Sequence, residues 1–582
     1  MKTYWKYVKP YLPFFILGPL LMLSEVAGEI VLPKIVASMI DYGVGDQAMG
    51  WGTSYIISRA LIMFACIGLM IVGGIGGHFF SIRASVYFSA DLRKGLFKKV
   101  QGFSFRNIDK FSTGSLVTRL TNDITQIQNM LRMLLIMAMR APGMLIGGFI
   151  MAFNINASLA AVLAVLIPLI AVVTTFVFSL SYPRFEIVQK QLDGLNSSIQ
   201  ENITNVRVIK SFVRQKFEKL KFDTANDALM NTTLHAFAVI IIAMPLMTLA
   251  MNVTTVAVVW VGGRFVINGT MGVGELTAFT TYIVQILMSL VMFSMLFLQM
   301  PRTLASSKRV KEVLGTESDI SDDNAKHKDK LVTEGRVEFR NVSFKYYENR
   351  KDYILDHIDL TFEPGKVVGI IGTTGSGKSS LVQLIPRLYD AMEGEVLVDG
   401  VNVRDYSLYN LREGVGMVLQ KNVLFSGSVI DNLRWGDENA TEEEIRAAAA
   451  AAHADGFIRE LAGGYDMELG QGGVNVSGGQ KQRLCIARTL LKKPKILILD
   501  DSTSAVDTAT EARIREAFHT SLKDSTKIII AQRITSVIDA DMIVVLEDGR
   551  VAGVGTHKEL MKSCNEYRDI YYSQVDAEKE VS

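Results

Sequence analysis

The chain has 582 residues, a formal net charge of +2 at pH 7 and a hydrophobic fraction of 49%. This length exceeds one ordinary domain, and a charge so near zero argues against nucleic acid or another polyanion as a partner. The mean hydropathy of +0.25 is high for a soluble protein, and three widely spaced cysteines (Cys66, Cys485 and Cys564) fit neither a disulfide framework nor a metal cluster.

Long apolar stretches fill the first half of the sequence. Each exceeds the ~20 residues that a helix needs to cross a bilayer, and they lie near 13–40, 55–82, 129–153, 157–181, 236–262 and 273–300. The segments 83–128 and 182–235 are rich in Lys and Arg, whereas the loops 41–54 and 154–156 contain neither. The positive-inside rule therefore predicts a multi-pass protein of the cell membrane, with an all-α domain of about six spans and a cytoplasmic C-terminal half.

Three charged residues interrupt the apolar stretches. Glu25 and Glu29 lie four residues apart, hence on one helical face, and Arg140 lies in the third stretch. A charge at the centre of a membrane helix costs ~2.5–3.5 kcal/mol on insertion scales. One interpretation places the glutamates on a water-filled cavity that attracts cationic amphiphiles. The alternative is that they hydrogen-bond to neighbouring helices or lie near the membrane interface.

A charged segment that is poor in apolar residues, 306–334, separates the two halves of the sequence. It predicts a transmembrane domain with cytoplasmic helical extensions at 1–310, a linker at 311–334 and a soluble domain at 335–582. The soluble domain begins with segments that alternate like strands, which indicates a change from an all-α to an α/β organisation.

A phosphate-binding loop is predicted in the soluble domain. Strand-like segments at 337–344 and 355–362 come first. An apolar run at 367–371 then leads into a full match to GxxxxGK[ST], and a helix-like run at 380–388 follows. The match consists of Gly372, Thr373, Thr374, Gly375, Ser376, Gly377, Lys378 and Ser379. In such a loop the glycines let backbone N–H groups surround phosphates, Lys378 reaches the outer phosphates, and Ser379 offers a hydroxyl to Mg²⁺.

A second Gly-rich turn lies about a hundred residues further on. It consists of Ser477, Gly478, Gly479 and Gln480, and it precedes a helix-like run at 481–491. An apolar strand at 496–499 then ends on two carboxylates, Asp500 and Asp501. A strand that delivers an acid at its C-terminal end is how an open α/β sheet places a metal-binding carboxylate beside a phosphate.

These segments resemble the nucleotide-binding domain of the ABC transporter family. The turn at 477–480 is similar to the family's signature, the strand ending at Asp500 to its Walker B strand, and 501–507 to the acid and D-loop that follow. In this family two domains sandwich two ATP molecules, each between one domain's Walker motifs and the other's signature. Over the whole chain, the resemblance implies the type IV exporter fold, in which a six-helix transmembrane domain precedes an α/β P-loop domain.

The resemblance also implies the cofactors, ATP and Mg²⁺, and the residues that hold them. Tyr346 occupies the place of the aromatic residue that stacks on adenine, and Gln420 that of the Q-loop glutamine. The implied nucleotide-binding residues are Tyr346, 372–379, Ser380, Gln420 and Asp500, and the implied metal-binding residues are Ser379, Gln420 and Asp500. The D-loop residues are Ser504, Ala505 and Asp507, and the signature residues Ser477, Gly478, Gly479 and Gln480 act in trans.

The basic cytoplasmic segments look helical, and the resemblance implies that they extend the membrane helices inward. Coupling helices at their tips, near 111–118 and 203–212, would then rest on the nucleotide-binding domains. The alternative is that these segments are passive stalks.

Two catalytic positions depart from the family pattern. Asp501 stands where the family has the Glu that polarises the attacking water, and Gln532 stands where it usually has a His that contacts the γ-phosphate. The carboxylate is one methylene shorter, and a misplacement of ~1 Å can reduce a rate about a hundredfold. Gln donates a hydrogen bond but carries no positive charge near neutral pH.

This pattern resembles one half of heterodimeric bacterial ABC exporters, which often export drugs. It predicts a degenerate ATP site on this chain, and a homologous partner chain whose Walker B Glu and switch His match the consensus. The expected activity is ATP-driven export of small amphipathic compounds, because the membrane domain precedes the ATP-binding domain on one chain. The alternatives are lipid or peptide export, or a low-turnover sensor or channel gated by ATP or a ligand.

Overall fold

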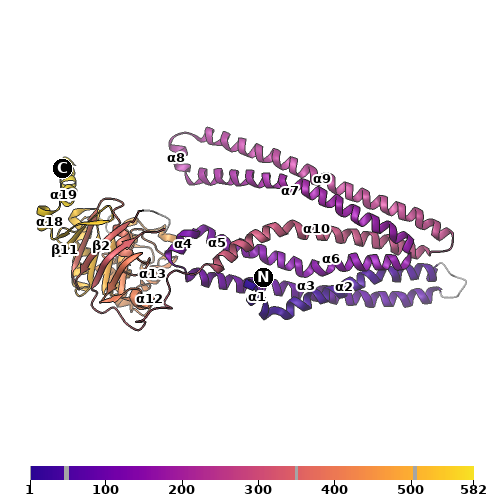
Figure 1. Ribbon diagram of the computed structural model, residues 1–582, viewed down its shortest axis with the longest axis horizontal. Helices are drawn as coiled ribbons and strands as arrows, with labels where there is room; N and C mark the ends of the chain where they lie inside the picture. The colour runs from indigo at the N-terminus through magenta and orange to yellow at the C-terminus, as the bar shows by residue number, and fades with distance from the viewer. Residues whose placement is uncertain (1, 45–51, 348–351, 502–507, 582) are drawn as a thin grey trace. The chain divides into compact units, whose positions relative to one another are not determined.

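The computed structural model describes residues 2–44, 52–347, 352–501 and 508–581 (Figure 1). In it the chain forms two units, which are Met1–Gln101 with Thr113–Gly315, and Gly102–Ser112 with Thr316–Ser582. The first unit is helical and holds the apolar stretches. The second holds the sheets and the phosphate-binding loop, together with a short segment that the predicted boundaries assigned to the membrane domain.

The first unit has long helices that contain all the apolar stretches. They are α2 (Leu12–Ser38), α3 (Gly52–Gln101), α6 (Ile124–Ile155), α7 (Ala157–Thr204), α9 (Gln215–Ile267) and α10 (Val273–Gly315). Shorter elements are α1 (Lys2–Val8), η1 (Lys9–Tyr11), η2 (Met39–Val44), α5 (Thr113–Thr118), η4 (Arg119–Asp123) and α8 (Val206–Ser211). Within the described residues, four segments are long and apolar enough to cross a membrane: Thr3–Val44, Gly52–Gln101, Thr113–Ile155 and Val273–Phe293.

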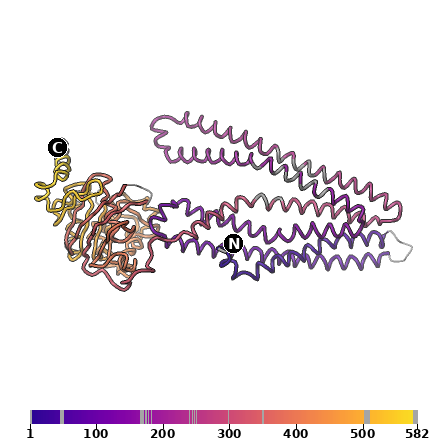
Figure 2. The backbone as a smooth tube through the Cα atoms, viewed as in Figure 1, coloured from indigo at the N-terminus to yellow at the C-terminus, as the bar shows by residue number. Residues whose placement is uncertain are grey.

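Small residues let α2 and α3 pack closely. A Cβ placed on Gly73 of α3 would lie 2.2 Å from the hydroxyl oxygen of Ser24, and one on Gly77 would lie 2.5 Å from the Cε of Met22. Close approach at small residues drives helix association in lipid, where burial of apolar surface gives little driving force. α7 and α9 form a second long antiparallel pair, and α8 lies at its tip (Figures 1 and 2).

Ion pairs join η4 to the C-terminal part of α10. Arg309 Nε donates to Asp123 Oδ2 at 2.8 Å, and Arg119 Nη1 donates to Glu312 Oε2 at 2.9 Å. The Asp123 side chain is only 3% exposed. A carboxylate removed from water in this way depends on its cationic partner, because an uncompensated buried charge is strongly destabilising.

The second unit contains a four-stranded antiparallel sheet and a six-stranded, mostly parallel one. The first has the order β2-β1-β4-β5 and the second β12-β11-β3-β10-β9-β6, in which β12 is the antiparallel edge. The strands of the first are β1 (Val337–Phe344), β2 (Leu355–Phe362), β4 (Glu393–Val398) and β5 (Val401–Asn402). Those of the second are β3 (Val367–Gly372), β6 (Val415–Val418), β9 (Ile496–Asp500), β10 (Thr526–Ile530), β11 (Met542–Glu547) and β12 (Arg550–Gly555). The strand-like segments predicted from the sequence are confirmed as β1, β2, β3 and β9.

Helices connect and cover these strands. They are α11 (Lys378–Gln383), α12 (Leu408–Gly414), α13 (Val429–Arg434), α14 (Glu442–Ala451), α15 (Asp455–Glu460), α16 (Gly478–Leu491), α17 (Thr508–Ser521), α18 (His557–Ser563) and α19 (Asn565–Val581). A small ribbon, β7 (Gly427–Ser428) with β8 (Glu468–Leu469), lies in the same region of the sequence as α13 to α16.

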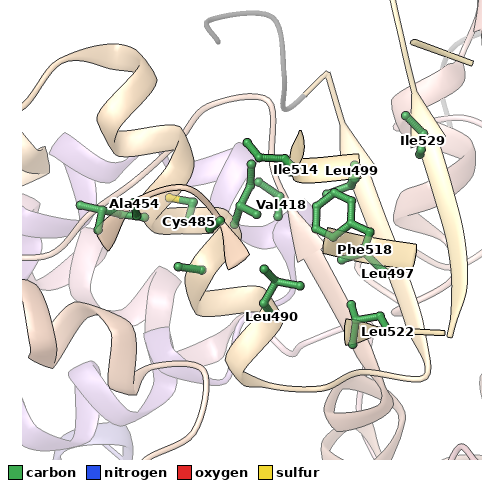
Figure 3. Close-up of a cluster of buried hydrophobic side chains, with 14 of the residues drawn as sticks. Val418, Ala454, Cys485, Leu490, Leu497, Leu499, Ile514, Phe518, Leu522 and Ile529 are labelled. Carbon is green, nitrogen blue, oxygen red and sulfur yellow. The ribbon is translucent and has the colours of Figure 1, made fainter. Parts of the chain in front are cut away.

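The central strands lie between two hydrophobic cores. Ile496 and Ile498 of β9 belong to the core shared with the antiparallel sheet, whereas Leu497 and Leu499 belong to the core that contains Leu490 of α16 and Phe518 of α17 (Figure 3). Both faces of the strand are therefore covered, and β9 is buried along its whole length, as is typical of a parallel sheet.

A short helix, α4 (Phe105–Phe111), packs within the second unit. Its Asp109 accepts a hydrogen bond from the Tyr389 hydroxyl at 2.8 Å, and Arg106 Nη1 lies 3.7 Å from Asp319 Oδ2. A reciprocal capping box of Ser104 and Asn107 begins the helix. The predicted tip at 111–118 is therefore displaced, because the docked residues are 102–112 and α5 belongs to the other unit.

The η4–α10 contact yields a stability prediction. We expect Arg309→Met to lower the melting temperature of the full chain in detergent by about 2–4 °C, because it leaves the Asp123 carboxylate buried beside fewer donors. Lys308→Met is the matched control, since it removes the same charge from an exposed neighbouring position. The melting temperatures of both variants are measured by heating samples and monitoring the remaining folded protein by size-exclusion chromatography. Equal shifts in the two variants would contradict the inferred role of the ion pair.

Candidate active site

The phosphate-binding loop joins the C-terminal end of β3 to α11. Two of its glycines have backbone angles or surroundings that exclude a side chain. Gly372 has φ +155°, and a Cβ there would lie 2.1 Å from the Leu546 carbonyl oxygen. Gly377 has φ +93°, and a Cβ there would lie 2.9 Å from the Ile354 carbonyl oxygen. The predicted strand, loop and helix are thus present, with the tight backbone path that such a loop requires.

The Lys378 ammonium group is held by the loop itself. Its Nζ donates to the carbonyl oxygens of Gly372 at 2.9 Å and Thr373 at 2.7 Å. Burial lowers the pKa of Lys378, and the nearby carboxylates of Asp500 and Asp501 partly oppose that shift. A cation positioned in this way over a loop of backbone N–H groups suits the binding of phosphate oxygens.

Asp500 lies next to the loop at the end of β9. Ser379 Oγ donates to Asp500 Oδ1 at 2.9 Å, and the carboxylate is almost fully buried. Burial raises the pKa of Asp500, while the Ser379 hydrogen bond opposes the shift. A hydroxyl and a carboxylate are hard oxygen ligands of the kind that Mg²⁺ takes from a protein when substrate phosphates supply the others. The described residues contain no cluster of three or more His, Cys, Asp or Glu side chains that could hold a metal ion.

Two glutamines converge on the neighbouring carboxylate, Asp501. Gln532 Nε2 donates to Asp501 Oδ2 at 2.6 Å, and Gln420 Nε2 approaches the same oxygen at 3.4 Å. Asp501 has φ +49°, and its N–H donates to the Ile530 carbonyl oxygen at 3.0 Å, which fixes the side chain at this edge of the sheet. Burial raises the pKa of Asp501, and the hydrogen bonds from the two amides oppose the rise.

Tyr346 reaches the loop from the end of β1. Its hydroxyl lies 2.9 Å from Ser380 Oγ, and its ring centroid lies 5.0 Å from that of Tyr389, nearly perpendicular to it. Arg106 of α4 donates to the Tyr346 carbonyl oxygen at 3.3 Å. The structure therefore brings Tyr346 to the loop and connects it through Tyr389 to the docked helix α4.

The signature turn begins α16 with a reciprocal cap. The Ser477 N–H donates to Gln480 Oε1 at 2.9 Å, and the Gln480 N–H donates to Ser477 Oγ at 3.3 Å. Ser477 and Gly478 are exposed, and no atom lies within 4 Å of a Cβ placed on Gly478. The turn is therefore capped and accessible. The predicted D-loop residues Ser504, Ala505 and Asp507 lie outside the described residues.

The two membrane glutamates share one guanidinium group. Arg140 Nη1 donates to Glu25 Oε1 at 3.0 Å, and Arg140 Nη2 donates to Glu29 Oε1 at 2.5 Å. Contact with a neighbouring helix, one of the two interpretations from the sequence, is thus observed for both residues. Glu29 also lines a cavity of about 470 Å³, together with Gln285 and other residues of the helical unit.

The sequence shows Arg140 within an apolar stretch but does not pair it with the glutamates. The signal was available, because a charge in an apolar span is expected to find a partner there. The sequence does not mark Tyr389, and it places the docked helix some residues later than α4, near 111–118. Nothing in the local pattern around Tyr389 marks it, since its role depends on residues about 280 positions away along the chain.

Comparison with known proteins decides the family. Residues 15–290 match the model for the ABC transporter transmembrane region, and residues 355–504 match the ABC transporter model. The uncharacterized ABC transporter ATP-binding protein YfiB of Bacillus subtilis (strain 168) is 40% identical over 576 residues, which cover 98% of both chains. The chain belongs to the ABC transporter family. A second ABC transporter relative, the uncharacterized protein Rv1273c of Mycobacterium tuberculosis, is 37% identical over 575 residues, which cover 98% of this chain and 97% of that one.

A solved structure shows that the chain also has the fold of an ABC exporter. A bacterial Atm1-family ABC exporter with ATP bound matches with a TM-score of 0.78 and 25% identity, covering 97% of this chain and 98% of that one. The chain is thus an ABC exporter half-transporter, a multi-pass membrane protein with a helical transmembrane domain and a cytoplasmic, ATP-binding α/β domain. Such half-transporters pair into dimers and drive export with ATP.

The raised pKa of Asp500 predicts how Mg²⁺-dependent ATP binding responds to pH. Because the ionised carboxylate is the form that binds a cation, affinity should fall as pH decreases, and should do so above the value of about 3.9 typical of an exposed Asp. The ratio of affinities for a fluorescent ATP analogue with Mg²⁺ and with EDTA measures this in the full chain. Asp500→Asn should lose the acid-side dependence, and a dependence kept in that variant would contradict the assignment.

Proposed function

We propose that this chain is the degenerate-site subunit of a heterodimeric ABC exporter of amphipathic compounds, drugs among them. The observation that carries the proposal is the Asp501 carboxylate held at 2.6 Å by the amide of Gln532, with Gln420 at 3.4 Å on the same oxygen. In a hydrolysing site that carboxylate polarises water, and the residue in the place of Gln532 contacts the γ-phosphate. Here the two side chains bind each other.

Each substitution weakens catalysis for its own reason. Asp501 reaches one methylene less far than Glu, and a misplaced reacting group of ~1 Å can reduce a rate about a hundredfold. The amides of Gln532 and Gln420 both engage one carboxylate oxygen of Asp501, Oδ2, so that oxygen is less available to orient and polarise a water molecule. Gln532 also remains neutral where a His can be charged, so it stabilises less of the charge that develops on the phosphate oxygens.

The same site retains what nucleotide binding needs. We assign phosphate contacts to 372–380, with Lys378 at the outer phosphates, and the adenine contact to Tyr346. Ser379, Gln420 and Asp500 would hold Mg²⁺, which when bound neutralises charge on the β- and γ-phosphate oxygens. Ser504, Ala505 and Asp507 would form the D-loop contact. A site that binds well and hydrolyses poorly holds ATP for long periods.

The intact signature turn gives the chain its second role. Ser477, Gly478, Gly479 and Gln480 would complete the ATP site formed by the partner's Walker motifs, and the capped, exposed geometry of the turn supports this. The partner would then supply the consensus Glu and His, and turnover would occur mainly at that composite site. One chain therefore contributes unequal halves to the two sites.

The tip of the α7–α9 pair supports a contact with the partner. Ile203, Phe212 and Val213 beside α8 are 70%, 74% and 78% exposed. Large apolar side chains gathered on a cytoplasmic tip mark an interaction surface, and we assign this tip to the partner's nucleotide-binding domain. α4, in contrast, packs within the unit that contains this chain's own ATP site, through Asp109 and Tyr389.

ATPase measurements on the purified chain and on the pair test the proposal. The chain alone should hydrolyse ATP poorly, whereas the pair isolated from native membranes should hydrolyse it and respond to the transported compound. In the pair, Asp501→Asn should change turnover little, because the site is already impaired. Replacing the partner's catalytic Glu with Gln should remove most of the ATP turnover of the pair. Robust hydrolysis by this chain alone would contradict the assignment.

A gain-of-function variant is the matched control. Asp501→Glu with Gln532→His restores both consensus groups and should raise the hydrolysis rate of the chain alone by about tenfold or more.

Transport into inside-out vesicles separates export from the alternatives. Hydrolysis that is never coupled to uptake of any amphipathic compound would favour a sensor or channel, and uptake confined to lipids or peptides would favour those substrate classes.

A further inference from the structure

The cavity of about 470 Å³ in the helical unit has an unusual set of polar atoms. Glu29 Oε2 and Gln285 Oε1 are buried and have no hydrogen-bond partner among the described residues, and both residues line the cavity. The other Glu29 oxygen is bound to Arg140, and Gln285 Nε2 donates to the Glu29 carbonyl oxygen at 3.0 Å. The hydrogen bond from Gln285 Nε2 fixes the orientation of the Gln285 amide, with its oxygen toward the cavity. The two atoms without partners, Glu29 Oε2 and Gln285 Oε1, are therefore both acceptors.

The remaining polar groups in the lining also have their donors engaged. The Thr277 hydroxyl donates to the Val273 carbonyl oxygen at 3.0 Å, and the Thr281 hydroxyl donates to the Thr277 carbonyl oxygen at 3.1 Å. Their oxygen lone pairs are what they can offer to a ligand. The lining thus presents acceptors, and a buried acceptor without a donor is unfavourable until a ligand supplies one.

The charge of the neighbouring side chains also favours a ligand that carries hydrogen-bond donors. The cluster of Glu25, Glu29 and Arg140 contains two carboxylates and one guanidinium, so its formal charge is negative by one unit when all three are ionised. Charges within membrane helices are expected to be paired. Arg140 forms ion pairs with both glutamates. Glu25 lies outside the cavity lining. Of the two glutamates only Glu29 lines the cavity, so the negative charge of the cluster reaches the cavity through Glu29.

The rest of the lining suits an adaptable apolar body. Met63 and Met144 contribute from α3 and α6, and apolar residues of α2 and α10 complete the wall. Methionine side chains are flexible and polarisable, so they accommodate ligands of different shape. A negative end rich in acceptors and an apolar remainder describe an amphipathic site.

We propose that this cavity is a binding site for the positively charged, N–H-bearing end of an amphipathic substrate, such as a primary ammonium or amidinium group. Glu29 and Gln285 accept its hydrogen bonds, Thr277 and Thr281 provide further acceptors, and Glu25 holds Arg140 away from full neutralisation of Glu29. This inference rests on the proposed export of amphipathic compounds and specifies their chemical class.

Equilibrium binding of a fluorescent amine tests the site in the full chain, reconstituted in phosphatidylcholine nanodiscs. Dansylcadaverine carries a primary ammonium group, and its N-acetyl derivative has the same body without the charge. We expect the amine to bind above the level of empty nanodiscs, and Glu29→Gln to weaken that binding by about tenfold or more. Glu25→Gln removes the same charge from the same cluster but leaves both cavity acceptors in place, and should therefore weaken binding clearly less than Glu29→Gln does.

A second variant guards against misfolding of the first. Thr281→Val keeps the size of the side chain and removes an acceptor, and should weaken amine binding by about threefold. An unchanged melting temperature of the full chain verifies that each variant is folded. Equal affinity for the amine and its N-acetyl derivative, or equal losses in the Glu29 and Glu25 variants, would overturn the assignment.

The result is independent of the ATP-site proposal, because this binding requires neither ATP nor a partner chain. Failure here with an impaired ATP site would remove the substrate class and leave the degenerate site in place. Amine binding as predicted, together with strong ATP hydrolysis by this chain alone, would keep the substrate class and remove the degenerate site.

Discussion

The hydrogen bond between the Gln532 amide and the Asp501 carboxylate is the interaction on which the functional account depends. β9 and β10 are parallel neighbours, so the residues that follow them emerge at the same edge of the sheet. Asp500 and Asp501 are adjacent in sequence, yet they have different partners. Asp500 accepts from Ser379 of the phosphate-binding loop, and Asp501 accepts from Gln532 and Gln420. One carboxylate is arranged for a cation, and the other is occupied by amides.

Much of this architecture could be predicted from the sequence because it depends on local pattern. Apolar stretches long enough to span a bilayer became the long helices, and the GxxxxGK[ST] match became a strand, a loop and a helix with Gly372 and Gly377 in positions that exclude side chains. The two departures from the family pattern, at Asp501 and Gln532, were also visible in the sequence. What the sequence did not show is that these two side chains contact each other.

The features that sequence reasoning missed depend on residues far apart along the chain. Arg140 and the glutamates of α2 are more than 100 positions apart, and Tyr389 and Asp109 are 280 positions apart. Local periodicity contains no information about such pairs. The docked helix was placed some residues too late for the same reason, because its position is set by the Ser104 cap and by the partners of Asp109 and Arg106 rather than by the Gly-containing run at 111–118.

The most direct test of the account is the identity of the nucleotide at each site of the native pair during turnover. Cryo-electron microscopy of the complex with Mg²⁺ and ATP, under hydrolysing conditions, distinguishes ATP from ADP at both phosphate-binding loops. We expect intact ATP at the loop that contains Lys378 of this chain and ADP at the loop of the other chain. Two copies of this chain with ADP at both loops would contradict it.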